Sequence, residues 1–331
     1  MSLDNLDWIA NDLIPDMRPV MFRMARGGTP FGLATILADD TGQPPAGAQM
    51  VVTLTDRHGI LFGGDFDDEI ARRARAAIVD GKPHRQTGSP AGTVLIERVG
   101  PDDPALRELE ELTLLRQPVL WSSDGETRSC SATDRYTVLP AGDDMARVIF
   151  KPYQRLVVVG TSAFAMTTLR LGLKLNWEVE LVGAREEQFA ASLPGLSTIN
   201  SSPDRFLQAA PPDRWTAIVV ASGDADSEIA ALVPALLSHA GYVAATGSHA
   251  LASERNERLL AAGVPAAAIR RLKTPTAPGS ETRDPWDVAQ AVTTDIAALD
   301  RNETAPLGGA NRNGRSARPG ARVATAASRG A

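Results

Sequence analysis

Short apolar runs in the second half of the chain predict a parallel sheet that is buried on both faces. The run from Leu156 to Val159 is wholly apolar, and it ends at Gly160. The residues that follow recur at spacings of four, three and four, which places them on one face of a helix: Phe164, Thr168, Leu171 and Leu175. Further strands are expected at 178–182, 217–221 and 242–245. Strand, glycine turn, helix and strand make a βαβ unit, so this half is predicted to be Rossmann-like.

The first half has a mixed pattern that predicts an α+β fold with a mostly non-parallel sheet. Short strands are expected at 33–37, 50–54, 93–99, 119–122, 136–139 and 146–150, with one more after a turn at 56–59. Amphipathic helices are expected over Asp65 to Ile78 and Asp103 to Leu115. Apolar residues also recur at helical spacing over 3–24, where Pro15 and Pro19 divide the stretch into short pieces.

These patterns together predict an α/β protein with two domains and a tail. An N-terminal α+β domain is expected over 1–150, and a Rossmann-like, doubly wound parallel-sheet domain over 151–300. Asp284 and Pro285 are suited to capping a last helix over 286–299. Residues 301–331 are rich in Gly, Ala, Arg, Asn and Ser, so they are predicted to form a disordered basic tail.

Composition and charge exclude several classes of protein. The formal net charge of −6 argues against a general nucleic-acid binder, which is usually basic. No stretch approaches the roughly 18 apolar residues of a membrane helix. The acidic N-terminus resembles neither a secretory signal nor a transit peptide, so a cytoplasmic protein is expected. The chain has one cysteine, Cys130, which we interpret as an incidental thiol, and no Cys or His pair has metal-ligand spacing.

The turn after the first predicted strand of the second half is a degenerate dinucleotide fingerprint. The three glycine positions of G-x-G-x-x-G hold Gly160, Ser162 and Ala165. The acid that would bind a ribose hydroxyl after the second strand is also missing, since Gly183 follows Val182. The sequence therefore predicts a Rossmann-like fold more strongly than it predicts NAD binding. Arg185 is interpreted as either an anion ligand or a solvent-facing arginine.

Three other turns precede predicted helices and so expose backbone N–H groups. Gly63 and Gly64 open the helix that begins at Asp65, where the acids of the first turn favour the helix dipole but repel an anion. Two further turns lie at the carboxyl edge of the predicted parallel sheet, where open α/β folds bind ligands: Ser222 to Asp224 and Thr246 to Ser248. His249 follows the second of these turns, either as a phosphate contact or as an ordinary exposed histidine.

Short motifs in both halves share an order and spacing with one known family. In the first half these are PAGAQM at 45–50, Gly63 to Asp67, and AGTVLIERV at 91–99. In the second half they are VVVGTSAFA at 157–165, Val182 to Arg185, Ser222 to Asp224, and Gly247 with Ser248. Over roughly residues 28–299 the chain resembles the XdhC/CoxI family of accessory proteins for molybdenum hydroxylases.

The resemblance implies binding of the molybdenum cofactor (molybdopterin), its sulfuration, and its delivery to a xanthine or CO dehydrogenase. Five positions depart from the family motifs: Asp65 and Pro90 replace cysteines, Ala163 and Gly223 replace histidines, and Gly183 replaces an acid. A carboxylate is a hard oxygen ligand that cannot carry sulfur, so binding or docking is expected without sulfur transfer.

The resemblance and the exposed turns together define a candidate cofactor site without catalytic residues or metal ligands. Its expected members are Gly63, Gly64, Asp65, Gly160, Ser162, Ala163, Arg185, Asp224, Gly247, Ser248 and His249. The two domains are expected to face each other across a cleft lined by the Gly63 and Gly160 turns. Expected partners are a molybdenum hydroxylase subunit and proteins of cofactor supply or sulfuration, and a homodimer stays open.

Two functions of other classes also stay open. An NADP-dependent oxidoreductase would use Arg185 for the 2′-phosphate and would need a proton donor, for which Asp224 is the candidate. An aspartate after a buried strand is more often a helix cap than a catalytic acid. A structural paralogue that has lost its ligand would act through protein contacts alone.

Overall fold

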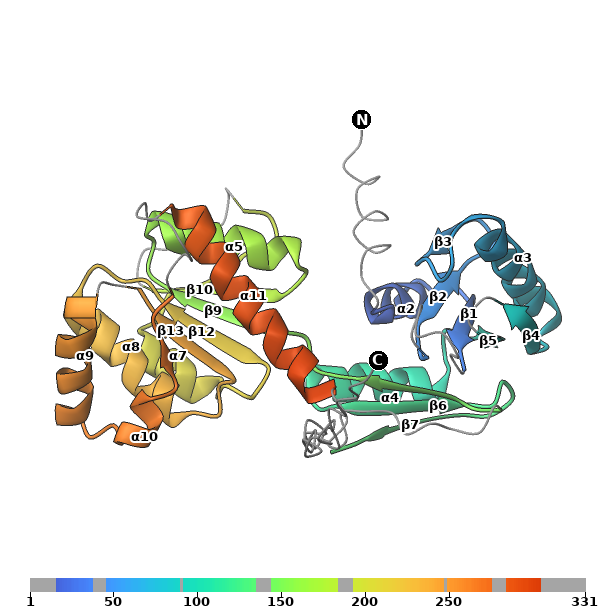
Figure 1. The fold of residues 1–331 in the computed structure, drawn as a ribbon. Coiled ribbons are helices and arrows are strands. Elements are labelled where there is room, and N and C mark those ends of the chain that lie inside the picture. Colours follow the sequence, from blue (N-terminus) through green and yellow to red (C-terminus); the bar gives the residue numbers. More distant parts are fainter. Residues whose placement is uncertain are drawn as a thin grey trace, which may run out of the picture.

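The computed structural model describes residues 16–37, 46–89, 92–134, 144–183, 193–246, 249–275 and 284–304. The first half contains a five-stranded antiparallel sheet in the order β3-β2-β1-β5-β4 (Figure 1). Its strands are β1 (Phe31–Ile36), β2 (Gln49–Val52), β3 (Arg57–His58), β4 (His84–Ser89) and β5 (Gly92–Val99). Side chains alternate between the two faces, as a sheet covered on both sides requires.

Each face of this sheet packs against a different layer. On one face Ala34 and Ile36 pack with the apolar side of α3 (Gly64–Asp80). On the other face Phe31 and Leu33 share a core with two helices and a second antiparallel sheet, in the order β7-β6-β8. These elements are α2 (Arg18–Arg26), α4 (Pro104–Leu114), β6 (Val119–Ser123), β7 (Arg128–Ala132) and β8 (Ala146–Phe150).

The second half is a doubly wound parallel sheet in the order β11-β10-β9-β12-β13-β14. Numbered within this half, the order is 3-2-1-4-5-6, which is that of the Rossmann fold. The strands are β9 (Arg155–Val159), β10 (Glu178–Val182), β11 (Ser197–Ile199), β12 (Thr216–Val220), β13 (Tyr242–Ala245) and β14 (Leu272–Lys273).

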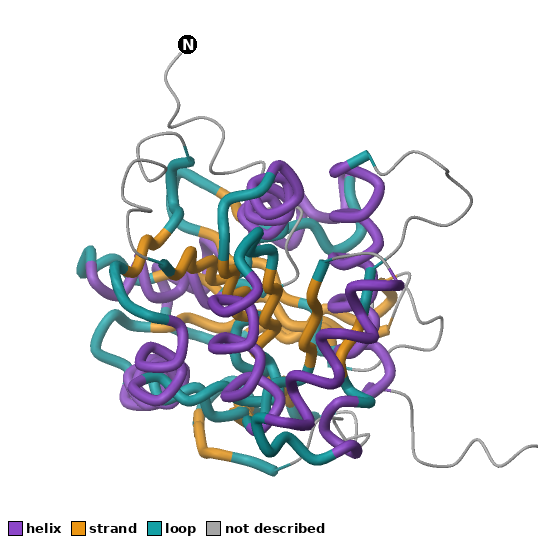
Figure 2. Tube along the Cα trace, turned by 90° about the vertical axis from the view of Figure 1, so that its left-hand side faces the viewer, coloured by secondary structure: helices purple, strands orange, loops and turns teal. Residues whose placement is uncertain are grey.

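Helices cover both faces of this parallel sheet (Figure 2). One face packs against α5 (Ala163–Lys174) and α11 (Pro285–Thr304). The other packs against α7 (Pro203–Ala209), α8 (Ala225–Leu237), α9 (His249–Ala261) and α10 (Ala266–Ile269). No helix in the described ranges is both long enough and apolar enough to cross a bilayer.

The predicted fold class is confirmed, and the differences lie in short or polar elements. The strand β4 was not expected, because its sequence HRQTGS contains no apolar alternation, and the polar run around Cys130 forms β7, the second strand of a hairpin with β6. The strand predicted to follow the turn at 56–59 instead begins at Arg57. The strand predicted at 136–139 and most of the helix predicted at 3–24 lie outside the described residues.

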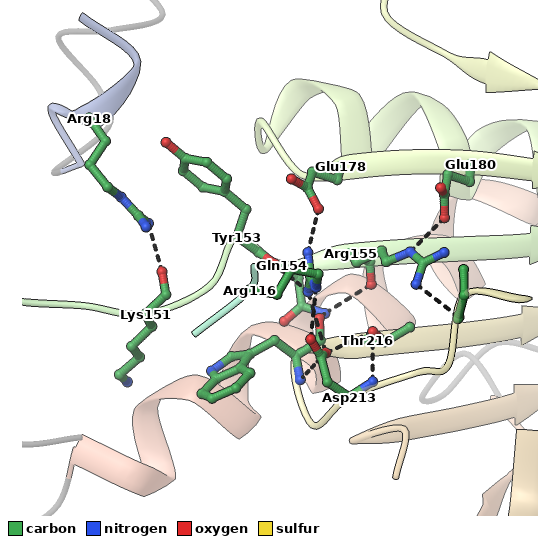
Figure 3. Close-up of polar contacts among 12 residues, drawn as sticks. Arg18, Arg116, Lys151, Tyr153, Gln154, Arg155, Glu178, Glu180, Asp213 and Thr216 are labelled. Carbon is green, nitrogen blue, oxygen red and sulfur yellow. Dashed lines mark hydrogen bonds and ion pairs between the residues drawn. The ribbon is translucent and has the colours of Figure 1, made fainter. Parts of the chain in front are cut away.

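Two arginines hold the segment 151–154, which joins β8 to β9 (Figure 3). Arg116 follows α4, and its Nε donates to Asp213 Oδ2 at 2.7 Å while its Nη2 donates to the Tyr153 carbonyl at 3.0 Å. Its Nη1 pairs with the Glu178 carboxylate. From the other side, Arg18 Nη2 donates to the Lys151 carbonyl at 2.6 Å.

The Arg116 contacts show which edge of the parallel sheet faces the first half. Glu178 is the first residue of β10, and Asp213 lies just before β12, so both belong to the amino ends of the strands. The carboxyl ends of these strands, with the turn after β9, therefore point away from the first half of the protein. Figure 1 shows α3 and α9 at opposite ends of the molecule. The expectation of one cleft lined by both the Gly63 and the Gly160 turns is wrong, because the first half contacts the amino edge.

The two acids at this joint have pKa values that shift in opposite directions. Burial raises the pKa of Glu178, against the opposing effects of the Arg116 and Arg155 guanidinium groups. Burial also acts to raise the pKa of Asp213, but hydrogen bonds from Arg116, Thr216 and Trp215 lower it overall. Asp213 is therefore held as a carboxylate, and its ionised form contributes to stability.

Gly160 lies where β9 and β12 meet, which is the point at which the strand order reverses. Its φ of 101° is a conformation that other residues rarely adopt, and a Cβ there would lie 2.6 Å from the Ala221 carbonyl oxygen. The glycine therefore serves close packing between the ends of two strands, as well as the turn into α5.

We expect Arg116→Met to lower the free energy of unfolding by about 2 kcal/mol at pH 7, because it leaves Asp213 without its charged donor. The folded-state pKa of Asp213 lies below its unfolded value of about 3.9. The contribution of the ionised Asp213 carboxylate to the free energy of unfolding is thus present above about pH 3.9 and is lost as the pH falls through the folded-state pKa. Denaturant titrations at pH 7 and pH 3 should show a larger deficit at pH 7 than at pH 3, because protonation of Asp213 removes its part of the deficit as the pH falls. Arg107→Met, at an exposed arginine, is the control and should change the free energy of unfolding little at either pH. An equal deficit for Arg116→Met at both pH values would show that the ionised Asp213 carboxylate does not carry the effect.

Gly160→Ala should destabilise the protein by about 3 kcal/mol, since it combines backbone strain with a clash against Ala221. Gly223→Ala is the matched control on the neighbouring turn, where no atom lies within 4 Å of the added Cβ. Thermal unfolding of the two variants should separate them clearly. Similar melting temperatures would mean that the close approach at Gly160 is not rigid.

Candidate functional site

The start of α3 is a backbone anion nest that the chain fills with its own carboxylate. Gly63 and Gly64 both have positive φ, at 78° and 62°. The fully buried side chain of Asp67 accepts three backbone hydrogen bonds, at 3.1 Å from Leu61, 2.9 Å from Phe62 and 3.0 Å from Gly63. Successive N–H groups of this kind are the usual ligands of a bound phosphate. Here Asp67 occupies the N–H groups of Leu61, Phe62 and Gly63, so the loop before α3 offers little to an external anion.

Asp65 lies in the first turn of α3 with an exposed side chain. It occupies the position of a cysteine in the motif described above, and its carboxylate cannot form a persulfide or hold a soft metal through sulfur. Cys130, on β7, does not replace that cysteine. Burial and the nearby Glu108 raise the pKa of its thiol to about 12, so it stays protonated at neutral pH.

The start of α8 is also occupied by the chain's own acids. The Asp224 carboxylate accepts a hydrogen bond from the Ser227 N–H at 2.8 Å and so caps the helix. Hydrogen bonds from the Ser227 side chain and backbone lower the pKa of Asp224. An exposed carboxylate with a lowered pKa is a poor proton donor, so this aspartate acts as a helix cap.

Two ion pairs neutralise the remaining acids at this helix start. Asp226 pairs with Arg258 at 2.5 Å, and Glu228 pairs with the buried Arg255. Arg255 also donates to the carbonyl of Thr246, the residue after β13. Arg258 and the Nε and Nη2 atoms of Arg255 are therefore engaged by protein acceptors, and the first turn of α8 keeps the negative charge of Asp224.

The start of α5 differs from the other two because no acid lies in its first turn. The Ser162 hydroxyl accepts from the Ala165 N–H at 3.2 Å, and Ser162 and Ala163 are exposed. Ala165 is buried against the sheet, at the position where the third glycine of the fingerprint allows close packing. The first N–H groups of a helix have no intrahelical acceptor and carry a partial positive charge. This helix start is thus suited to an anionic group such as a phosphate.

The expected site residues are divided between separate parts of the molecule and segments outside the described residues. Arg185, Gly247 and Ser248 lie outside the described residues, as does Pro90. His249 begins α9, but its side chain is not described. Gly160, Ser162 and Ala163 lie together at the start of α5, on a different part of the molecule from Gly63, Gly64 and Asp65 (Figure 1). Among the described residues no cluster of His, Cys, Asp and Glu could hold a metal ion.

Sequence reasoning missed the roles of Asp67, Glu228 and Arg255. In the sequence Asp67 is one of several acids in the first turn of the helix that follows Gly63 and Gly64. Its spacing of four residues from Gly63 was the only sequence signal for its hydrogen bonds to the preceding loop. Glu228 and Arg255 are 27 residues apart, so their pairing could not be deduced from the chain alone.

Asp67→Ala should lower the free energy of unfolding by about 2–4 kcal/mol, because it leaves three N–H groups without an acceptor. Asp65→Ala is the matched control two residues away, and it should change stability by no more than about 0.5 kcal/mol. Denaturant titration of both variants checks this. Equal stability would show that the nest does not depend on the Asp67 carboxylate.

Comparisons with known proteins agree with this geometry in both halves. Residues 156–296 match the model of the XdhC Rossmann domain, and residues 24–88 match that of the XdhC and CoxI family. A search of curated proteins found no match.

A solved structure from Bacillus halodurans, described as a xanthine dehydrogenase, shares the fold with a TM-score of 0.66. It is 17% identical in sequence, and the similarity covers 86% of this chain and 96% of that one. Matches in both halves, in the expected order, show that the chain belongs to the XdhC and CoxI family. Membership of this family suggests an accessory role toward a xanthine dehydrogenase.

Proposed function

We propose that this chain is an accessory protein of a molybdenum hydroxylase, of the xanthine or CO dehydrogenase type. It binds the molybdenum cofactor by its phosphate at the start of α5 and docks to the apo-enzyme, without catalysing a reaction itself. The observation that carries the site is the difference between three helix starts. Asp67 binds the N–H groups of the loop before α3, and Asp224 caps α8, whereas the first turn of α5 contains no acid.

The protein's own groups would act on the phosphate through backbone donors and the helix dipole. Ala163 and Phe164 supply N–H groups at the first turn, while the Ser162 hydroxyl continues to accept the hydrogen bond from the Ala165 N–H. Gly160 keeps the turn close to β12. Such donors recognise a phosphate whatever pterin or nucleotide it carries. When bound, the cofactor supplies the redox-active metal that the hydroxylase requires.

The residues present do not fit a sulfur-transfer role. The motif position of the family cysteine holds Asp65, and the thiol of the chain's single cysteine is protonated at neutral pH. Sulfuration therefore belongs to a separate protein that acts before or after this one. The NADP-dependent alternative has no support at Asp224, because that side chain is an ionised helix cap.

The test is the cofactor content of protein purified anaerobically from cells that make molybdopterin. Molybdenum analysis and fluorescence of the oxidised pterin should give near-stoichiometric values for the wild type. Ala163→Glu places a charge at an exposed first-turn position, where it favours the helix but repels a phosphate, and should lower the content about tenfold or more. Ala163→Gln, of similar size and without charge, should retain it.

Each other outcome has a defined meaning. No pterin in the wild type would overturn the carrier function and leave docking to be judged by co-elution with the apo-hydroxylase. Equal pterin in Ala163→Glu and wild type would place the phosphate away from α5. Both variants should melt like the wild type, since the side chain of Ala163 is exposed.

A further inference from the structure

The first described helix continues an apolar stripe that begins upstream. Met17 and Met21 lie buried in the core around α2 and α4. The same spacing of three to four residues extends back through Leu13, Ile9 and Leu6. We call residues 3–14 the N-terminal segment; they precede the described residues. An apolar stripe at helical spacing needs a surface against which to pack.

The point at which the N-terminal segment joins the described protein is fixed beside the end of α4. Asp16 accepts hydrogen bonds at 3.0 Å from both the backbone N–H and the Nε of Arg18. The buried Arg18 in turn donates through Nη1 to the Thr113 hydroxyl at 3.3 Å. Pro15 disfavours helical conformation at the residue before it, so the chain can change direction there. The segment therefore starts next to the last turn of α4.

Two leucines at that end of α4 have no cover among the described residues. Leu114 and Leu115 follow Thr113 directly and are 77% and 67% exposed. Leu114 lies one helical turn after Glu110, which pairs with Arg26 of α2 at 3.4 Å. The Leu114 side of α4 therefore faces α2, which is the helix that the N-terminal segment precedes.

Charge favours the same placement. The N-terminal segment carries Asp4, Asp7 and Asp12 and no lysine or arginine. The last turn of α2 presents Arg23 and Arg26, both exposed. Opposite charges of this kind orient a segment on a surface while apolar contacts hold it.

We propose that the N-terminal segment of this chain docks on its own α4, with Leu6, Ile9 and Leu13 packed over Leu114 and Leu115. This apolar surface precedes Arg116, the residue that joins the two halves. The docked segment thus covers the side of α4 next to the joint.

A double-mutant cycle in the full-length chain tests this docking. Ile9→Asp and Leu114→Asp should each lower the melting temperature by about 2–4 °C. The double variant should fall no further than the more affected single variant, because either change already displaces the segment. Leu260→Asp, at a leucine that is 53% exposed on α9, is the control and should be additive with Ile9→Asp.

Additive effects of Ile9→Asp and Leu114→Asp, or no effect of either one, would overturn the proposal. Light scattering after size-exclusion chromatography separates docking within one chain from docking between chains. The expected mass is the same for the wild type and for Ile9→Asp. A wild-type dimer that Ile9→Asp converts to a monomer would place the segment on a second copy and overturn docking within the chain.

Discussion

The Arg116 guanidinium sets the relation between the two halves of this protein. It lies just after α4 and reaches a carboxylate before β12, a carboxylate at the start of β10 and the carbonyl of Tyr153. A planar group with a fixed fork of donors satisfies three acceptors only in one relative orientation. That orientation directs the amino edge of the parallel sheet toward the first half, and the position of the opposite edge follows from it.

Three helix starts in the chain show how the same backbone feature takes different roles. Each offers N–H groups without intrahelical acceptors and a partial positive charge. At α3 the buried Asp67 binds the donors of the preceding loop, and at α8 Asp224 caps the helix among further acids. At α5 a neutral serine caps one donor and leaves the first turn without negative charge. The side chains near each start, rather than the helices themselves, decide where an anion is favoured.

The sequence was informative where burial is continuous and local. The runs that form β9 and β12 are apolar throughout, so their position and parallel pairing followed from the pattern. The strands β4 and β7 are polar, because they lie at sheet edges, and periodicity could not reveal them. The direction in which the sheet faces depends on Arg116 and Asp213, which are 97 residues apart. Long-range contacts of single polar side chains leave no periodic trace in the sequence.

Occupation of the amino edge by the first half has a steric consequence for assembly. The exposed residues after β9 and β12, among them Ser162, Ala163 and Asp224, lie on the outside of the molecule. A macromolecule as large as an enzyme subunit can approach that side while the joint at 151–154 stays closed. Exchange of a small molecule across such a contact would then need no hinge opening within this chain, and its rate would depend on the encounter of the two proteins.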